Sequence, residues 1–347
     1  MTRLFIIAIL AAPATLTPAS AQTQPQSVPT CQALQAGATA VARTKPYVDA
    51  PIEQLRKMVP SLSGMKLDAG QNATDNSVDR LAQEKAASIL SQTGAAVANM
   101  LHRMPNLIAR EEVRQPDGAY QPGGAGALSR GRPATQGMPG SNLDQYNFRV
   151  FSYRIVPRTK VHGGDALDEF RTDAHDHPTD DSAHKHDNPQ SVGYATTWLF
   201  FFPGNLKEST YRYLGQQKIE NRETYVLAFA QIPDKTFLNT VVDSSLGRCS
   251  TSIQGIAWID ESTFQIVRMQ TDLLSPQPAI QLNQLRSVIN YSEVKIPERN
   301  LLLWLPKDVE VTWQAADRAG EELHTYSKYR LFASTVRILP PDETPSH

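Results

Sequence analysis

Alternation of apolar and polar residues is the dominant pattern of the chain from residue 196 to residue 332. This period of two is typical of β-strands, because successive side chains of a strand point to opposite faces of a sheet. Two earlier runs bring the total to about ten strands, which predicts a mainly β (α+β) fold, an antiparallel meander curved into a half-barrel. The predicted strands are residues 106–114, 146–156, 196–202, 210–217, 224–231, 255–260, 264–274, 286–295, 302–313 and 323–332.

The clearest predicted hairpin covers residues 256–274, with the sequence IAWIDESTFQIVRMQTDLL. The short oxygen-bearing side chains at residues 260–263 favour a β-turn, and antiparallel pairing across this turn places Ile259 opposite Phe264. One face of this hairpin is apolar along its whole length and therefore needs a cover. The residues predicted for that face are Ile256, Trp258, Val267, Met269 and Leu273.

Residues 76–104 carry the strongest helix pattern. Asn76 is a suitable N-terminal cap, and Pro105 ends the helix because proline disfavours helical geometry in the residue before it. Gly94 in the middle predicts a kink or a close packing contact. We expect this amphipathic helix to lie on the concave face of the sheet, through Val78, Leu81, Ile89, Val97, Met100, Leu101 and Met104. A second, short helix is predicted over residues 51–59.

An N-terminal signal peptide is predicted over residues 1–21, because Arg3 precedes a short apolar run and Ala21 ends a small-residue cleavage pattern. We therefore expect a periplasmic or secreted protein that begins after Ala21. No later run reaches about 18 apolar residues, so the chain is predicted not to span a membrane. The other predicted parts are a loosely ordered segment 22–71, one β domain 72–335 with flexible insertions 115–144 and 157–190, and a tail 336–347.

Charge and cysteine content give few indications of a partner. After removal of Arg3 with the signal peptide, 33 Lys and Arg remain against 35 Asp and Glu. This near-neutral balance gives no electrostatic reason to expect nucleic acid as a partner. Cys31 and Cys249 are compatible with an oxidising compartment, and the sequence leaves open whether they form a disulfide or remain two thiols.

A His- and Asp-rich loop, residues 173–187, is the one candidate for metal binding. Neutral imidazole and carboxylate groups are ligands that suit Zn, Ni or Cu. The loop lacks apolar anchors that would hold such ligands in place, which favours a solvated polar insertion that binds Zn only adventitiously. We therefore expect no dedicated cofactor. The four candidate ligands are His175, His177, His184 and His186.

Candidate catalytic residues are few, and we expect no enzyme. The sequence contains no nucleophile elbow, no zinc-protease motif and no phosphate-binding loop. Asp260 and Asp272 are predicted on one hairpin face with Arg268 between them, which is typical of an ion pair within a sheet. His102 lies near a helix end, where it suits the helix dipole, and His324 has no partner recognisable from the sequence.

Three stretches of the strand-rich half resemble a group of exported bacterial proteins of a kind common in acidobacteria: residues 211–231, residues 255–276, and residues 303–313 together with 324–332. The order of elements more loosely resembles the LolA-like superfamily of lipoprotein carriers. The strand–turn–strand element of that superfamily is matched here by Trp258-Ile259-Asp260, Thr263 and Arg268. The resemblance implies an antiparallel half-barrel with helices in its concave side, and a cavity for acyl chains between them.

The function expected from these patterns is non-catalytic binding of a hydrophobic ligand, such as the acyl chains of a lipid or a lipoprotein, in the cell envelope. Helix 76–104 would act as the lid of the site. The alternative is an envelope structural or interaction protein whose sheet is filled by its own side chains and has no ligand cavity. The residues predicted to line the site are Trp198, Phe200, Tyr225, Phe229, Ile256, Trp258, Val267, Met269 and Met100.

Overall fold

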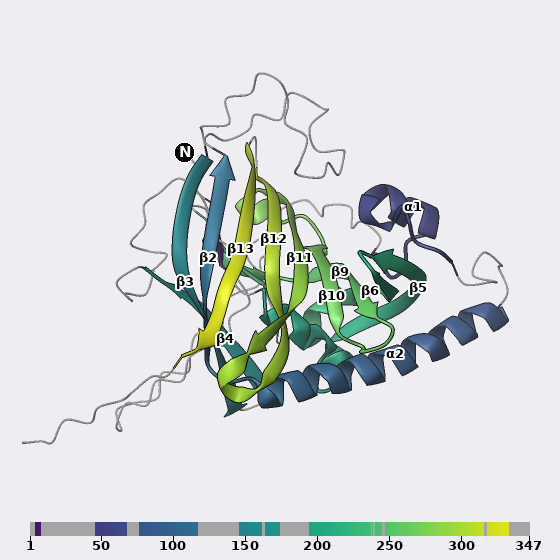
Figure 1. Ribbon diagram of the computed structural model, residues 1–347. Coiled ribbons are helices and arrows are strands. Elements are labelled where there is room, and N and C mark those ends of the chain that lie inside the picture. The colour runs from purple at the N-terminus through teal and green to yellow at the C-terminus, as the bar shows by residue number, and fades with distance from the viewer. Residues whose placement is uncertain are drawn as a thin grey trace, which may run out of the picture.

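The computed structural model describes residues 4–7, 46–67, 76–116, 146–161, 164–173, 194–236, 238, 240–244, 247–315 and 318–332. Their main feature is one ten-stranded antiparallel sheet with the strand order β4-β3-β2-β13-β12-β11-β10-β9-β6-β5 (Figure 1). The sheet is open, since β4 and β5 form its two edges. The predicted fold class, a curved antiparallel meander or half-barrel with few helices, is confirmed.

The strands of the large sheet mostly follow the predicted alternation. Their bounds are β2 Leu107–Pro116, β3 Tyr146–Val161, β4 Gly164–Thr172, β5 Ser209–Ile219, β6 Arg222–Gln231, β9 Ile253–Asp260, β10 Ile266–Leu273, β11 Leu282–Ile296, β12 Leu301–Ala315 and β13 Arg318–Leu331. β4 lies within the insertion predicted at residues 157–190, where no strand is predicted from the sequence.

A second, small sheet has the order β1-β7-β8. Its strands are β1 Leu4–Ile7, β7 Thr240–Ser244 and β8 Gly247–Thr251. β1 falls within the residues predicted as a signal peptide, which remains a prediction. Cys249 lies in β8 opposite Val242, whereas Cys31 is outside the described residues, so the disulfide also remains a prediction.

The hairpin of β9 and β10 is present, but its register differs from the predicted one. Ile259 pairs with Ile266 and Trp258 pairs with Arg268, with a bulge at Val267 between them. The reason lies in the turn, where Phe264 adopts a left-handed φ of 56° and its N–H donates to the Asp260 carbonyl. The turn is therefore longer than expected. Because paired residues share a face of the sheet, Trp258 and Met269 lie on opposite faces, not on one.

The two faces of the sheet have different covers near β5, β6, β9 and β10. We call the face that carries Tyr225, Leu227 and Phe229 of β6 the inner face. It is covered by α2, Asn76–Arg103, and by the short 3-10 helix η3, Thr196–Phe201. On the outer face lies the segment 46–67, with α1 Ile52–Met58 and η2 Pro60–Leu62. Figure 1 shows α1 and α2 on opposite sides of this part of the sheet.

Helix α2 matches the predicted helix 76–104 and packs mainly on β5 and η3. The Lys85 ammonium lies 4.6 Å from the ring centre of Tyr213 on β5. The expected close contact at Gly94 is present, since a Cβ there would lie 3.2 Å from the Phe201 carbonyl oxygen and 3.3 Å from Pro203 Cγ. Among the described residues, no helix combines the length and apolar character needed to cross a membrane.

Residues 46–67 lie within the segment predicted to be loosely ordered, yet specific hydrogen bonds attach them to the outer face. The Tyr47 hydroxyl donates to Asp272 Oδ2 over 2.9 Å, and the Tyr47 N–H donates to Gln254 Oε1 over 2.8 Å. Arg286 Nη2 donates to the Met58 carbonyl. Gln254, Asp272 and Arg286 on the outer face therefore hold the segment 46–67 in place.

Residues 196–202 form no strand, contrary to the prediction, because η3 occupies this position. All six residues of η3 are buried. The run therefore lacks the exposed face that a half-buried strand with alternating side chains would have. The 3-10 turns instead direct its aromatic rings to several strands of the inner face. Trp198 contacts Tyr291 of β11, with ring centres 5.5 Å apart, and Phe200 contacts Phe229 of β6 at 5.4 Å.

Candidate functional site

The inner face carries an apolar cluster beneath α2 and η3. Phe201 packs its ring against Tyr211 and Phe229, at 5.5 Å and 5.7 Å between ring centres. Phe229 also meets Phe200, so two strands and η3 share one aromatic group. These rings form one buried aromatic cluster between the sheet and its cover.

The structure brings together most of the predicted lining residues on this side. Trp198 and Phe200 come from η3, and Met100 is buried on α2, the helix that covers the inner face. Tyr225, Phe229 and Met269 lie on the inner face itself, because their register partners are Ile259, Gly255 and Ala257.

Two predicted lining residues, Ile256 and Trp258, lie on the outer face, where their register partners are Gln270 and Arg268. Trp258 Nε1 donates to Gln217 Oε1 over 3.0 Å, and Gln217 donates to the Ser61 carbonyl over 2.7 Å. The outer face at Trp258 is therefore connected to the segment 46–67 and does not face α2. Val267 is buried at the bulge between the two faces.

The predicted metal ligands, His175, His177, His184 and His186, lie outside the described residues, and Zn binding there remains a prediction. Within the part of the chain that the structure describes, no group of three or more His, Cys, Asp or Glu side chains is arranged to hold a metal ion.

The same inner face carries a buried charge network toward β4, β3, β2 and β13. Its position follows from one row of register pairs that crosses the sheet: His324, Val309, Ile289, Met269, Ala257 and Leu227. Leu227 faces the apolar cluster, so His324 lies on the same side of the sheet. Glu111, Arg171, Glu322 and His324 make up this charge network, and all four are almost fully buried.

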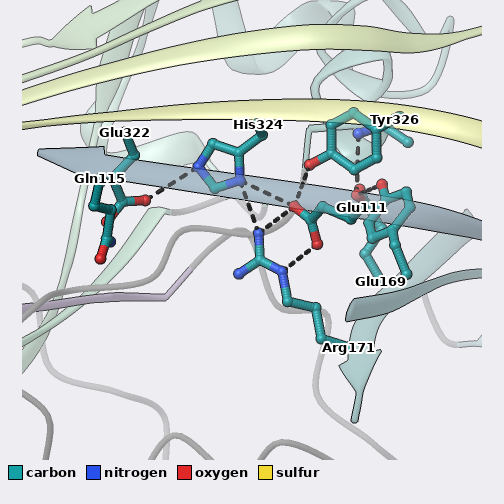
Figure 2. Close-up of polar contacts among 9 residues, drawn as sticks. Glu111, Gln115, Glu169, Arg171, Glu322, His324 and Tyr326 are labelled. Carbon is teal, nitrogen blue, oxygen red and sulfur yellow. Dashed lines mark hydrogen bonds and ion pairs between the residues drawn. The ribbon is translucent and has the colours of Figure 1, made fainter. Parts of the chain in front are cut away.

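Arg171 of β4 and Glu111 of β2 are the centre of the charge network (Figure 2). Arg171 donates from Nε and Nη2 to the two carboxylate oxygens of Glu111, the two-pronged geometry that favours arginine over lysine. His324 Nδ1 lies 2.9 Å from Glu111 Oε1 and 3.1 Å from Arg171 Nη2, and its Nε2 lies 3.1 Å from Glu322 Oε2. The imidazole is thus held between two carboxylates.

Neutral groups complete the coordination of both carboxylates. The Tyr326 hydroxyl donates to Glu111 Oε1 over 2.7 Å, and Gln115 Nε2 donates to Glu322 Oε1 over 2.7 Å. Buried charges require this degree of pairing, because an unpaired ion in the interior is strongly unfavourable.

These contacts shift the pKa values of Glu111 and His324 in opposite directions. Burial alone raises the pKa of Glu111, but the charge and hydrogen bonds of Arg171, with those of His324, outweigh it and hold the pKa at about 2. Burial alone lowers the pKa of His324, but its hydrogen bonds to Glu111 and Glu322 outweigh this and raise the pKa. The Glu111 and Glu322 carboxylates therefore favour the protonated form of His324, whereas burial and the nearby Arg171 oppose it.

Glu169 of β4 connects this region to η3. Its carboxylate accepts hydrogen bonds from the Tyr153 hydroxyl and from the backbone N–H groups of Ala195 and Thr196, at the start of η3. Burial raises the pKa of Glu169, and these hydrogen bonds counteract part of that effect. Tyr194, one residue further back, places its ring 5.3 Å from that of His324. The position of η3 is thus fixed from the polar half of the inner face.

The charge network is not among the features predicted from the sequence. A usable signal was present in β2, where Leu107, Ala109, Glu111 and Val113 occupy alternate positions and so share a face with apolar neighbours. A carboxylate in such a series is expected to be buried and paired. Its partners are 60 and 213 residues away, so the sequence gives no indication of which residues they are.

The chain matches known proteins only at the level of solved structures, and at low sequence identity. No protein-family model and no curated protein sequence matches the chain. Among solved structures, it is similar to an outer membrane lipoprotein-sorting protein domain from Vibrio parahaemolyticus, with a TM-score of 0.34, 10% identity, and coverage of 69% of this chain and 92% of that one. A DUF1329 family protein from Desulfovibrio piger gives a TM-score of 0.35 and 10% identity, with coverage of 71% and 95%.

A third similar structure is MucB in complex with MucA(peri), with a TM-score of 0.20, 10% identity, and coverage of 72% of this chain and 100% of that one. One of these matches is a lipoprotein-sorting protein domain, the kind of protein that the order of elements loosely resembles. An identity of 10% transfers neither a ligand nor an activity to this chain.

Proposed function

We propose that this chain is a non-catalytic binding protein of the cell envelope whose inner face takes a hydrophobic ligand, such as the acyl chains of a lipid or lipoprotein. The observation that carries the proposal is the arrangement of the apolar cluster under a separate cover. The aromatic rings of β5, β6 and η3 lie beneath α2, an amphipathic helix rather than a further strand of the sheet. An amphipathic helix that lies on an apolar surface is suited to move aside for an apolar ligand.

The contacts of α2 support the role of a lid. Its buried residues form one stripe on the helix and include Ala86, Ile89, Val97, Met100 and Leu101, whereas its other side is exposed. Within the described residues, its main contacts are limited to β5 and η3. Opening therefore breaks side-chain contacts along one stripe and leaves the backbone ladder of the sheet intact.

The proposal is tested by titration of the purified mature protein with a fluorescent long-chain fatty acyl probe, together with mass spectrometry of lipids that co-purify. Tyr225→Ser removes a ring from the inner face beside α2 and should weaken probe binding tenfold or more, because an aromatic ring contributes roughly 1.5–3 kcal/mol when buried. Phe148→Ser is the matched control, since Phe148 is 49% exposed and lies on the outer face of β3. It should bind the probe as the wild type does.

The alternative function is that of an envelope structural or interaction protein. One observation favours it, because Phe200, Phe201 and Phe229 are already fully buried against one another. A wild-type protein that binds no acyl probe and carries no lipid would overturn the ligand-binding proposal and favour this alternative.

A further inference from the structure

Two buried hydrogen-bonding groups in the cover have no partner among the described residues. One is Trp198 Nε1 on η3, a residue 2% exposed, and the other is Thr93 Oγ1 on α2, a residue with no exposed surface. An indole N–H can only donate, and an unpaired donor in the interior is unfavourable. Buried polar groups normally have a partner, so these two indicate a ligand or group that accepts hydrogen bonds there.

The two groups come from α2 and η3, which contact each other. Thr93 precedes Gly94, whose position lies against the Phe201 carbonyl. Trp198 is three residues before Phe201, and residues three apart in a 3-10 helix lie on the same side of it. That side faces the sheet, because Phe201 packs on Phe229 of β6 and Trp198 packs on Tyr291 of β11.

Other polar groups near this crossing are already paired. Thr197 Oγ1 and the Tyr291 hydroxyl are 2.6 Å apart, and each also bonds to the Tyr194 carbonyl. The two unpaired groups are therefore distinct from this small hydrogen-bonded set.

We propose that Trp198 and Thr93 form an anchor for the carbonyl oxygen of an acyl ester or acyl amide, the polar head of the ligand that the inner face binds. This inference rests on the proposed function and adds the chemical class of the head group. A carbonyl oxygen has two lone pairs and accepts one hydrogen bond from each residue.

A neutral carbonyl fits this site better than a free carboxylate. An ionised carboxylate in an apolar interior requires a paired cation. The cation of α2 closest in sequence to Thr93 is Lys85, about two helical turns or ~12 Å along the axis, and it lies over the Tyr213 ring. Both anchor groups are neutral, so they satisfy a carbonyl but do not balance a full negative charge.

The test compares a long-chain fatty acid with its methyl ester and its N-methyl amide, as competitors of the fluorescent acyl probe. Wild type should bind the ester and the amide more tightly than the free acid, and the tighter of the two distinguishes ester lipids from N-acylated groups as the source. Trp198→Phe and Thr93→Val should each weaken binding of the preferred carbonyl compound about tenfold, the equivalent of ~1.4 kcal/mol.

Thr172→Val is the matched control. Thr172 Oγ1 is also buried without a partner among the described residues, but it lies on β4, away from the cover. This variant should bind all three compounds as the wild type does. Thermal unfolding of each variant gives the second measurement, because replacing an unpaired buried polar group by an apolar group of similar shape should leave Tm unchanged or raised.

The outcomes separate the two proposals. If wild type binds no acyl compound, the proposed function fails and the anchor fails with it. If wild type binds but Trp198→Phe and Thr93→Val bind equally well, the anchor alone is overturned. A lowered Tm with unchanged affinity shows that the two groups have an internal structural role, and also overturns the anchor.

Discussion

The pairing of Glu111 with Arg171 can be tested by a double-mutant cycle of Glu111→Leu and Arg171→Met. Each single substitution leaves one charge buried without its main partner, which should destabilise the protein by about 3–5 kcal/mol. The double variant replaces both charges by apolar groups of similar size and should lose much less than the sum of the single variants. A coupling energy of more than ~2 kcal/mol is therefore expected.

The magnitude agrees with the pKa of Glu111. The charge network holds this pKa at about 2, against an ordinary value of 4.5, which corresponds to roughly 3 kcal/mol of stability at neutral pH. Because the folded-state pKa is lowered, this contribution is fully present above about pH 4.5 and is lost as the pH falls toward 2. Glu111→Gln lacks the contribution, so its free energy of unfolding should fall less over this range.

His324 gives the opposite dependence, which separates its effect from that of Glu111. Its folded-state pKa is raised, so its contribution is present below about pH 6.5 and is lost as the pH rises through the folded-state pKa. His324→Gln should therefore show less loss of stability than wild type on going from mildly acidic to alkaline pH.

Urea unfolding followed by circular dichroism measures these free energies. The matched control is Glu223→Gln, because Glu223 forms an exposed pair with Lys218 at 4.0 Å. This substitution should change stability by less than about 0.5 kcal/mol. Strictly additive effects of the Glu111 and Arg171 substitutions, or single effects below ~1 kcal/mol, would refute the reasoning from buried charge pairing.

Two further substitutions test the sheet itself. Gly255→Ala should destabilise the protein by more than ~3 kcal/mol in urea unfolding, because the added Cβ would lie 2.2 Å from the Gln270 carbonyl oxygen. Gly64→Ala is the control and should be close to neutral, because the nearest atom to its Cβ would be 3.6 Å away. Asp260→Ala should lower the free energy of unfolding by about 2–4 kcal/mol. Asp260 Oδ1 accepts hydrogen bonds within the turn, from the backbone N–H of Thr263 over 2.9 Å and from that of Ser262. A variant as stable as the wild type would contradict this role.

The strands and α2 could be predicted because their signals are local. Alternation in β11, β12 and β13 reports one buried and one exposed face, and the apolar stripe of α2 reports contact with a surface. η3 could not be predicted in this way, because a short run that is buried on all sides has no periodicity to distinguish a strand from a helix. The register error at Phe264 arose from a left-handed residue that follows no turn rule based on Gly or Asn.

The charge network lay beyond sequence reasoning for a different reason. His324 has no partner visible in the sequence, and the alternation in β2 marks Glu111 as buried without indicating its partners. Their pairing depends on β13 lying beside β2 and on β4 reaching the same face, which is a property of strand order. Local patterns therefore identify which residues are buried, whereas the fold alone determines which buried charges meet.

The position of β13 beside β2 also constrains the order in which the chain can fold. β2 is the first strand of the large sheet in sequence and β13 is the last, yet they are neighbours in its interior. The Tyr326–Glu111 bond spans 215 residues, and the bond between Tyr47 and Asp272 on the outer face spans 225. Contacts of such long range form slowly and only after almost the whole chain is available. Without β13, the strands β2, β3 and β4 have no neighbour that connects them to the rest of the sheet, so the large sheet cannot be completed before this last strand is in place.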